Sequence, residues 1–263
     1  MRARLHTKDT NYHAASLMYS SEMDATQVQL NQRVERTPDS IMHRYQRNRH
    51  WRLYPKEYIY RNFPPAGRCW LDFGCGTGEI TSQLAALGAS RVIGVDIDPG
   101  LTGMAGLRAE LDRVSDRVQV LCGDIATIEP QPVDVALCFA VLHHVPDRLG
   151  ETVAAIRRWL NPGGVFICVE PVRFTHWLDW VSGHVGVPPQ PLDPGERKLT
   201  EQDLRLIEDG FAYSHRVYFH VLARLSRLWP AADGLFRRLD RCFLFLPGAK
   251  RLAGTVILIC RTD

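Results

Sequence analysis

The feature that most constrains the fold is a glycine run, Asp72-Phe-Gly-Cys-Gly-Thr-Gly78, between a strand pattern and a helix pattern. Cys69–Phe73 is short and apolar, as expected for a buried strand, and Glu79–Leu87 has helical spacing and is followed by Gly88. Glycines at alternate positions let the backbone turn sharply and approach a ligand without Cβ clashes. Since the following helix presents unpaired N–H groups, this junction predicts a polar-ligand site.

The same alternation continues over the middle of the chain. Further strands are expected at Val92–Val95, Val118–Leu121, Asp134–Ala140 and Val165–Val169, with helices over about Leu101–Leu111 and Arg148–Leu160. Strands separated by helices need crossover connections, which produce a parallel sheet covered on both faces. Nearly continuous apolar strands agree with burial on both faces. The sequence therefore predicts an α/β, doubly wound sheet.

The N-terminal part departs from this alternation. Residues 1–66 are polar, basic and aromatic, with helix signals over about Ser21–Val34 and Thr37–His50. Pro64-Pro65 then breaks the chain. We therefore expect an N-terminal helical segment, residues 1–66, ahead of a main domain, residues 67–263.

The C-terminal part is expected to close the sheet. Thr200-Glu-Gln-Asp203 fits a capping box with Asp in place of the usual Glu or Gln, and its helix should end at Gly210. Ala212–Phe219 and Gly254–Cys260 are both strand-like. A closing pair of strands, one antiparallel to the rest, is therefore expected, with an insertion of about residues 221–251 between them.

Three carboxylates follow the expected strands at the same end, namely Asp72, Asp96 and Asp124. Asp96 is placed to accept hydrogen bonds from two ribose hydroxyls, and Asp124 to accept one from an adenine amino group. A single Asp after a strand is as often a helix cap. Three at successive strand ends favour a nucleoside site, because those ends meet at one edge of the sheet.

At these positions the chain resembles the class I S-adenosylmethionine-dependent methyltransferases. The matching pieces are Leu71–Gly78, Gly94–Asp98, Cys122–Ile125, Val133–Val135 leading to Val141–Val145, and Leu160–Gly164. They cover about residues 68–170 in the family's order and spacing.

The resemblance implies S-adenosylmethionine as the cofactor and assigns a role to each strand end. The methionine part would lie on Asp72, Gly74, Cys75, Gly76 and Gly78, the ribose on Asp96, the adenine against Ile97, Asp124 and Ile125, and the sulfonium beside Phe139 and Ala140. The family's seven-stranded, mostly parallel sheet has the order 3-2-1-4-5-7-6, with Gly254–Cys260 as the antiparallel seventh strand. Asn161–Gly164 would be a structural turn before the fifth strand, and the N-terminal helices would form a lid.

Methyl transfer from a sulfonium is an in-line displacement of an already activated methyl group, so the protein mainly supplies alignment and a dry pocket. An oxygen acceptor also needs a base. His143 and His144 follow the fourth strand, beside the expected methyl position. Either can act as the base or contact the acceptor, and His144 is preferred because related enzymes often carry His there. The alternative is that both cap the next helix or contact the cofactor structurally.

The expected function is therefore methyl transfer to a small molecule, first to oxygen, with carbon and nitrogen acceptors left open. The Asn/Asp-Pro-Pro-aromatic signature of nucleic-acid base methylation is missing at Cys138–Leu142, which argues against DNA. No metal-ligand cluster stands out, so no metal is expected. A nicotinamide-dependent oxidoreductase is disfavoured because Glu79 stands where its fingerprint wants Gly. A non-catalytic relative is disfavoured by the intact glycine loop.

Three segments outside the shared core are expected to serve the acceptor. Arg44–Lys56 interleaves arginines with aromatics, which suits an anionic or flat substrate, RNA, or packing on the core. The long loop Glu170–Leu199 should border the acceptor pocket. In the 221–251 insertion, Leu235, Phe236, Leu239, Cys242, Phe243 and Leu246 share one helical face, opposite Arg237, Arg238, Asp240 and Arg241. That helix either packs as a lid or lies on a membrane surface, in which case a lipid-like acceptor is expected.

Composition adds the expected location. No apolar run follows the basic start, and no apolar stretch approaches the roughly 18 residues of a membrane span. None of the seven cysteines forms a Cys-x-x-Cys pair, and most lie in apolar runs. The net charge of +3 is too small to indicate a nucleic-acid partner. We therefore expect a cytoplasmic protein, peripheral to the membrane if the insertion binds lipid; the sequence indicates no oligomeric state.

Overall fold

The computed structural model describes residues 49–175, 196–222, 229–246 and 248–263. The chain divides into two compact units, Met1–Tyr54 and Pro55–Asp263. The helix predicted over Ser21–Val34, and nearly all of the one predicted over Thr37–His50, lie outside the described residues. No helix in the described part of the chain is both long and apolar enough to cross a membrane.

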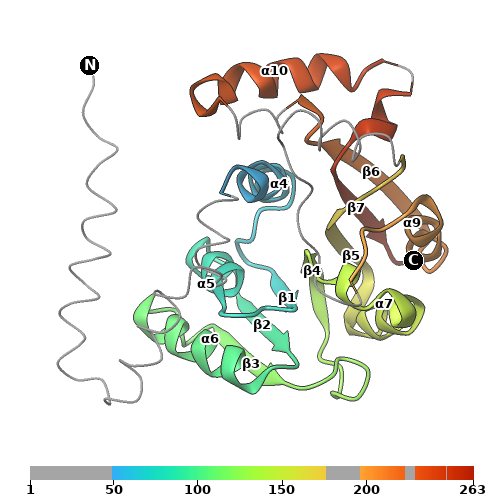
Figure 1. Ribbon diagram of the computed structural model, residues 1–263. Helices are drawn as coiled ribbons and strands as arrows, with labels where there is room; N and C mark the ends of the chain where they lie inside the picture. The colour runs from blue at the N-terminus through green and yellow to red at the C-terminus, as the bar shows by residue number, and fades with distance from the viewer. Residues whose placement is uncertain (1–48, 176–195, 223–228, 247) are drawn as a thin grey trace, which may run out of the picture. The chain divides into compact units, whose positions relative to one another are not determined.

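The main unit is built on a seven-stranded sheet with the order β3-β2-β1-β4-β5-β7-β6, as Figure 1 shows. The strands are β1 (Cys69–Phe73), β2 (Arg91–Asp96), β3 (Val118–Cys122), β4 (Val133–Phe139), β5 (Leu160–Pro171), β6 (Tyr213–Phe219) and β7 (Thr255–Arg261). β7 runs antiparallel to both of its neighbours, and the other pairings are parallel. The predicted fold class and strand order are confirmed.

The helices follow the predicted alternation. They are α4 (Arg49–Asn62), α5 (Glu79–Ala86), α6 (Pro99–Leu111), α7 (Leu149–Trp159), α9 (Glu201–Glu208) and α10 (Asp233–Phe243), with short 3₁₀ turns η1 (Leu142–His144), η2 (Pro146–Arg148), η4 (Pro230–Ala232) and η5 (Ala249–Leu252). The capping box predicted for α9 is present: the Asp203 carboxylate accepts from the Thr200 N–H, and the Thr200 hydroxyl accepts from the Asp203 N–H. Helix α4 was not predicted.

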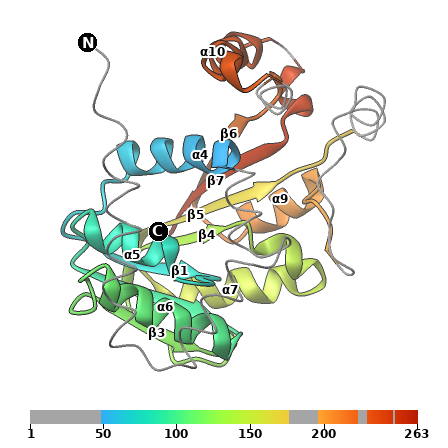
Figure 2. The same ribbon diagram turned by 60° about the vertical axis from the view of Figure 1, so that its left-hand side comes forward.

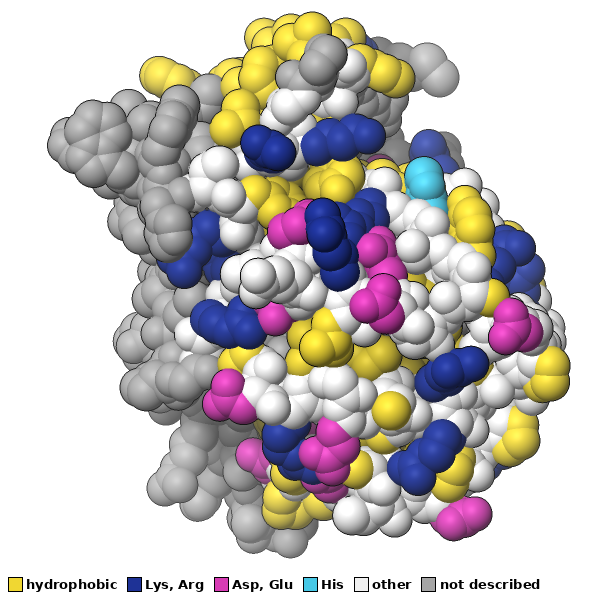
Figure 3. Space-filling model, turned by 90° about the vertical axis from the view of Figure 1, so that its right-hand side faces the viewer, with side chains coloured by type: hydrophobic (Ala, Val, Ile, Leu, Met, Phe, Trp, Pro, Cys, Tyr) yellow, Lys and Arg dark blue, Asp and Glu magenta, His cyan; other side chains and the backbone are white. Residues whose placement is uncertain are grey.

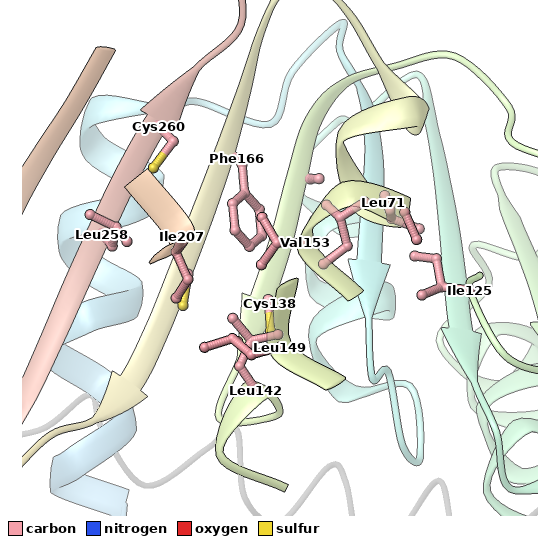
Figure 4. Packing of buried hydrophobic residues seen from close by; sticks show 14 of the residues in the cluster. Leu71, Ile125, Cys138, Leu142, Leu149, Val153, Phe166, Ile207, Leu258 and Cys260 are labelled. Atoms are coloured by element: carbon pink, nitrogen blue, oxygen red, sulfur yellow. The ribbon is translucent and has the colours of Figure 1, made fainter. Parts of the chain in front are cut away.

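The two faces of the sheet carry separate hydrophobic cores, because side chains alternate along each strand. Leu71, Phe166 and Cys138 face α7 and α9, which contribute Val153 and Ile207, as Figure 4 shows. On the other face, Trp70, Val135 and Leu137 join residues of α4, α5 and α6. Figure 2 shows α4 and α7 on different sides of the sheet. The sheet is therefore buried on both sides, and its carboxyl-end edge is left for the site.

One predicted detail is wrong. Asn161–Gly164 is not a turn ahead of the fifth strand but an irregular part of β5, which already begins at Leu160. The pairing with β4 shifts register here, because Leu160 pairs with Val133 and Val165 with Val135. Gly163 has a φ of 72° in this bulge, and its N–H donates to the carbonyl of Asp263 at 2.8 Å. The motif is structural, as expected, but it acts inside the strand.

Candidate cofactor and acceptor site

The glycine loop after β1 uses backbone conformations that favour glycine. Gly74, Gly76 and Gly78 have φ angles of 72°, 51° and 75°. A Cβ on Gly74 would lie 2.3 Å from Cγ2 of Val141, and one on Gly78 would lie 2.8 Å from Cα of Ala105. A Cβ on Gly76 would meet no described atom within 4 Å. The loop is thus closely packed at both ends and open in the middle, where a ligand can approach the backbone.

Asp96, the last residue of β2, holds this loop from the neighbouring strand. Its Oδ2 accepts a hydrogen bond from the Gly76 N–H at 2.8 Å, and its Oδ1 accepts one from the Asp98 N–H at 3.1 Å. The next residue, Ile97, carries an apolar side chain that is 71% exposed. The residues expected to meet ribose and adenine therefore lie together beside the open part of the loop.

Asp72 lies below the loop rather than on its surface. Its carboxylate is buried, and Oδ2 accepts a hydrogen bond from the Thr81 hydroxyl at 2.6 Å. Burial raises the pKa of Asp72 to about 6, against the lowering effects of Thr81 and Lys56. Cys75 is also buried, which raises the pKa of its thiol. Both side chains support the loop from inside, so ligand contacts from these positions would come from backbone.

The raised pKa of Asp72 predicts a specific pH dependence of stability. In the folded state the carboxyl keeps its proton to a higher pH than in the unfolded chain, so stability falls as pH rises from about 4 to about 6. The side chain of the Asp72→Asn variant cannot ionise, so the variant does not lose this stability. Its unfolding free energy relative to that of wild type should therefore rise by roughly 2–3 kcal/mol as the pH rises through this interval. Urea unfolding of both proteins at pH 4 and pH 7 measures this. An equal difference at the two pH values would contradict it.

Asp124 and Ile125 follow β3 and differ in accessibility. Asp124 Oδ1 accepts from the Ala126 N–H at 2.9 Å, and Oδ2 pairs with Nη1 of Arg148 at 2.9 Å. These contacts, the Ala126 N–H first and Arg148 second, lower the pKa of Asp124. The Ile125 side chain is 2% exposed and belongs to the core. Of the predicted adenine contacts, Asp124 therefore presents its side chain, and Ile125 can offer only backbone.

The end of β4 brings in a residue that was not predicted. Phe139 ends the strand, and Ala140 has a φ of 61°, a left-handed conformation uncommon outside glycine. Nζ of Lys56, on α4, lies 5.9 Å from the centroid of the Phe139 ring and 2.6 Å from Oε1 of Glu79. The Lys56 side chain is 8% exposed. A buried ammonium therefore stands beside the expected sulfonium pocket and the first turn of α5.

The two histidines differ in their surroundings, although both lie in η1 and their ring centroids are 4.0 Å apart. His143 is 7% exposed, and its Nδ1 lies 2.8 Å from Oε2 of Glu170, which is 0% exposed. His144 is 46% exposed, and its Nδ1 contacts Oε1 of Glu196. Both glutamates belong to the Glu170–Leu199 segment that was expected to border the acceptor pocket, but the sequence assigned no role to either of them. The structure thus contains two carboxylate–imidazole pairs side by side, one buried and one partly exposed.

These side chains also form a possible metal-ligand group, which the sequence did not suggest. Ligand atoms of His143, His144 and Glu196 lie within 4.8 Å of one another. Contacts with Glu170 and Glu196 already engage the Nδ1 atoms of both rings.

Comparison with known proteins matches the site to a family model. The model described as a methyltransferase domain covers residues 71–168. A ubiquinone biosynthesis O-methyltransferase of Burkholderia orbicola (strain MC0-3) is 37% identical over 100 residues, 38% of this chain and 42% of that protein. One of Xanthomonas axonopodis pv. citri (strain 306) is 30% identical over 167 residues, 62% of this chain and 64% of that protein. The chain spans about two fifths of the length of the Burkholderia relative it matches.

Solved structures share the fold at low sequence identity. Magnesium protoporphyrin IX methyltransferase (ChlM) from Synechocystis PCC 6803, with bound SAH, has a TM-score of 0.57 at 15% identity and covers 94% of this chain and 100% of its own. The [4+2]-cyclase SpnF has a TM-score of 0.56 at 21% identity, with 80% of each chain covered. Residues 71–168 therefore match a methyltransferase domain, and the chain shares its fold with solved methyltransferases such as ChlM.

Proposed function

We propose that this chain transfers a methyl group from S-adenosylmethionine to an oxygen atom of a small biosynthetic intermediate. The observation that carries the proposal is the glycine loop held by Asp96, open at Gly76 and flanked by the exposed Ile97. The relatives from Burkholderia and Xanthomonas carry the name O-methyltransferase, which supports oxygen as the acceptor atom. When bound, the cofactor supplies a methyl group already activated by the sulfonium.

The residues around the loop fit the parts of this cofactor. Asp96 would accept from the ribose hydroxyls, and Ile97 would pack on the adenine. Lys56 would attract the methionyl carboxylate, because its ammonium is held at the loop and partly screened from water. Asp124 would accept a hydrogen bond from the adenine amino group and give up its exposed ion pair with Arg148. Losing that pair would cost little, because exposed ion pairs contribute little to stability. Phe139 and Ala140 would border the sulfonium.

The acceptor would lie between the histidine pair and the segments outside the shared core. An oxygen acceptor that carries a proton needs a base, and His143 and His144 are the candidates nearest the end of β4. We also propose that residues 1–66 contribute a lid and that no metal ion takes part. The part of the Glu170–Leu199 loop that contains Trp177 and Trp180 lies outside the described residues.

Two measurements test this function. Calorimetry should show binding of S-adenosylmethionine and none of NAD. A labelled-methyl assay against phenolic and carboxylate acceptors should then give O-methylated product, with and without EDTA. Binding of NAD alone would reject the assignment, and a carbon- or nitrogen-methylated product would replace oxygen as the acceptor. Loss of activity in EDTA, restored by a divalent ion, would show that a metal is required and make His143, His144 and Glu196 its candidate ligands.

We further propose that α10 and the turn after it rest on a membrane surface. Leu235, Leu239, Phe245 and Leu246 are exposed, Phe245 by 88%, and Arg238 and Lys250 are exposed nearby. In Figure 3 hydrophobic side chains gather along the upper edge, at the height where Figure 1 draws α10, with Lys and Arg side chains below them. An apolar strip bordered by basic groups suits an anionic lipid surface. The seven free cysteines favour a reducing compartment, so we place this surface on the cytoplasmic side.

Vesicle flotation tests the membrane proposal. The protein should float with vesicles that contain anionic lipid, and Leu235→Asp with Leu239→Asp should abolish flotation by placing charges in the apolar strip. The control is Leu206→Asp, which changes an equally exposed leucine on α9 and should float like wild type. If the protein floats with neither neutral nor anionic vesicles, the membrane proposal is wrong.

A further inference from the structure

Glu170 is a buried carboxylate that joins the end of β5 to the turn after β4. Oε1 accepts hydrogen bonds from the N–H groups of Val141 at 2.8 Å and Leu142 at 2.7 Å. Oε2 lies 2.8 Å from Nδ1 of His143. Burying a charge this completely is costly unless hydrogen bonds compensate it. The two backbone N–H groups, the Cys138 thiol at 3.7 Å from Oε1 and the His143 ring contact this carboxylate and supply that compensation.

We propose that Glu170 is a positioning residue that makes His143, rather than His144, the proton acceptor of this site. The inference rests on the proposed function, and it names the base for the oxygen acceptor. It reverses the preference for His144 that the sequence favoured.

The contact with Glu170 selects one tautomer of His143. An ionised carboxylate offers only acceptors, so the Nδ1 that faces Glu170 must carry the hydrogen. The neutral ring then has its lone pair on Nε2, the nitrogen that can take a proton. When Nε2 accepts one, the ring becomes an imidazolium, and the adjacent Glu170 carboxylate stabilises that charge in a buried setting.

His144 lacks this environment. Its ring is 46% exposed, and water competes with Glu196 for its Nδ1. Its tautomer and orientation are therefore less tightly fixed than those of His143. Because a base contributes most when held in one geometry, the buried pair is the better placed of the two.

The acceptor hydroxyl gives its proton to Nε2 of His143 while the acceptor oxygen forms a bond to the methyl carbon. The carbon–sulfur bond breaks, and its electron pair stays on sulfur, which leaves as the neutral thioether. His143 then returns the proton to water.

The rival explanation is that Glu170 only clamps η1 through its two backbone hydrogen bonds. Glu170→Gln separates the two roles. The amide oxygen can still accept from the Val141 and Leu142 N–H groups, which keeps the clamp. The amide NH₂ then faces Nδ1 of His143 and donates to it, so the ring must carry its hydrogen on Nε2 and loses its capacity as a base.

The comparison variant is Glu196→Gln, the same change beside the other candidate base, His144. We expect Glu170→Gln to lower kcat about 100-fold or more, with KM for both substrates and the melting temperature nearly unchanged. Glu196→Gln should lower kcat much less than Glu170→Gln does, because solvent already screens that pair. Equal losses in the two variants, or a Glu170→Gln enzyme with wild-type kcat, would overturn the proposal.

A readout independent of activity keeps the two proposals separable. Nitrogen-15 NMR of the histidine rings, with His143 assigned through His143→Gln, should show the Nδ1–H form in wild type and the Nε2–H form in Glu170→Gln. An Nε2–H form in wild type would overturn the positioning role even in a fully active methyltransferase. If the tautomers are as expected but no acceptor is ever methylated, it is the proposed function that fails.

Discussion

Gly74→Ala is expected to destabilise the protein by roughly 2–4 kcal/mol and to weaken S-adenosylmethionine binding about tenfold or more. The residue has a φ of 72°, which an alanine side chain tolerates poorly. The added Cβ would also lie 2.3 Å from Cγ2 of Val141, so the loop or the turn after β4 must move. Urea unfolding and calorimetry measure the two effects.

Two further variants separate the causes. Gly67→Ala has a similar φ of 74° but would place its Cβ more than 4 Å from any described atom, so it should cost only about 1 kcal/mol and leave cofactor binding unchanged. Val141→Ala in the Gly74→Ala background removes the two shortest contacts, to Cγ2 and Cγ1, leaves only the 3.1 Å contact to Cβ, and should restore part of both losses. If Gly74→Ala behaves like Gly67→Ala, the contact between the loop and Val141 does not matter for the site.

Much of the fold was predictable because its signals are local. The apolar runs of β1, β2 and β4 are read directly from neighbouring residues, and Thr200 with Asp203 specifies the start of α9 within four positions. Strand order was not local information: it came from resemblance to a family, since periodicity does not say which strands are neighbours. Helix α4 was missed because Pro55 interrupts its interior, where proline normally ends a helix.

The histidines after β4 were predicted as site residues, but their carboxylate partners were not. Glu170 and His143 are 27 residues apart, and they meet only because β5 pairs with β4 in one register. Sequence spacing gives no sign of such a contact. Lys56 was overlooked for the same reason, since its place beside Phe139 depends on how α4 packs.

Burial was mispredicted where a polar group serves the backbone. Asp240 was placed on the polar outer face of α10, yet it is buried and accepts from the N–H groups of Val221 and Leu222. Those donors follow β6 and need acceptors, so the carboxylate turns inward. Leu235 and Leu239 lie on the predicted apolar face and are exposed, so the described part of the domain does not cover them. A helical wheel assigns faces but does not say which face the domain covers.

Asp96→Ala is expected to weaken S-adenosylmethionine binding by about 1–3 kcal/mol, or roughly 5- to 150-fold in Kd. The variant removes the acceptor proposed for the ribose hydroxyls and also the acceptor of the Gly76 N–H. Asp98→Ala is the matched control: it removes the cap of α6, which accepts from Gly100 and Leu101, and should cost about 1 kcal/mol of stability without changing Kd.

Loss of affinity in Asp96→Ala has two possible sources, a missing ribose contact or a loosened loop, and a ligand change distinguishes them. S-adenosylhomocysteine lacking both ribose hydroxyls should bind wild type more weakly than the parent compound. In Asp96→Ala, removing the hydroxyls should reduce the affinity only slightly further, because the carboxylate that would accept from them is already gone. The comparison has the form of a double-mutant cycle. If deletion of the hydroxyls costs the same in both proteins, Asp96 does not hold the ribose, and its hydrogen bond to Gly76 alone explains the weaker binding.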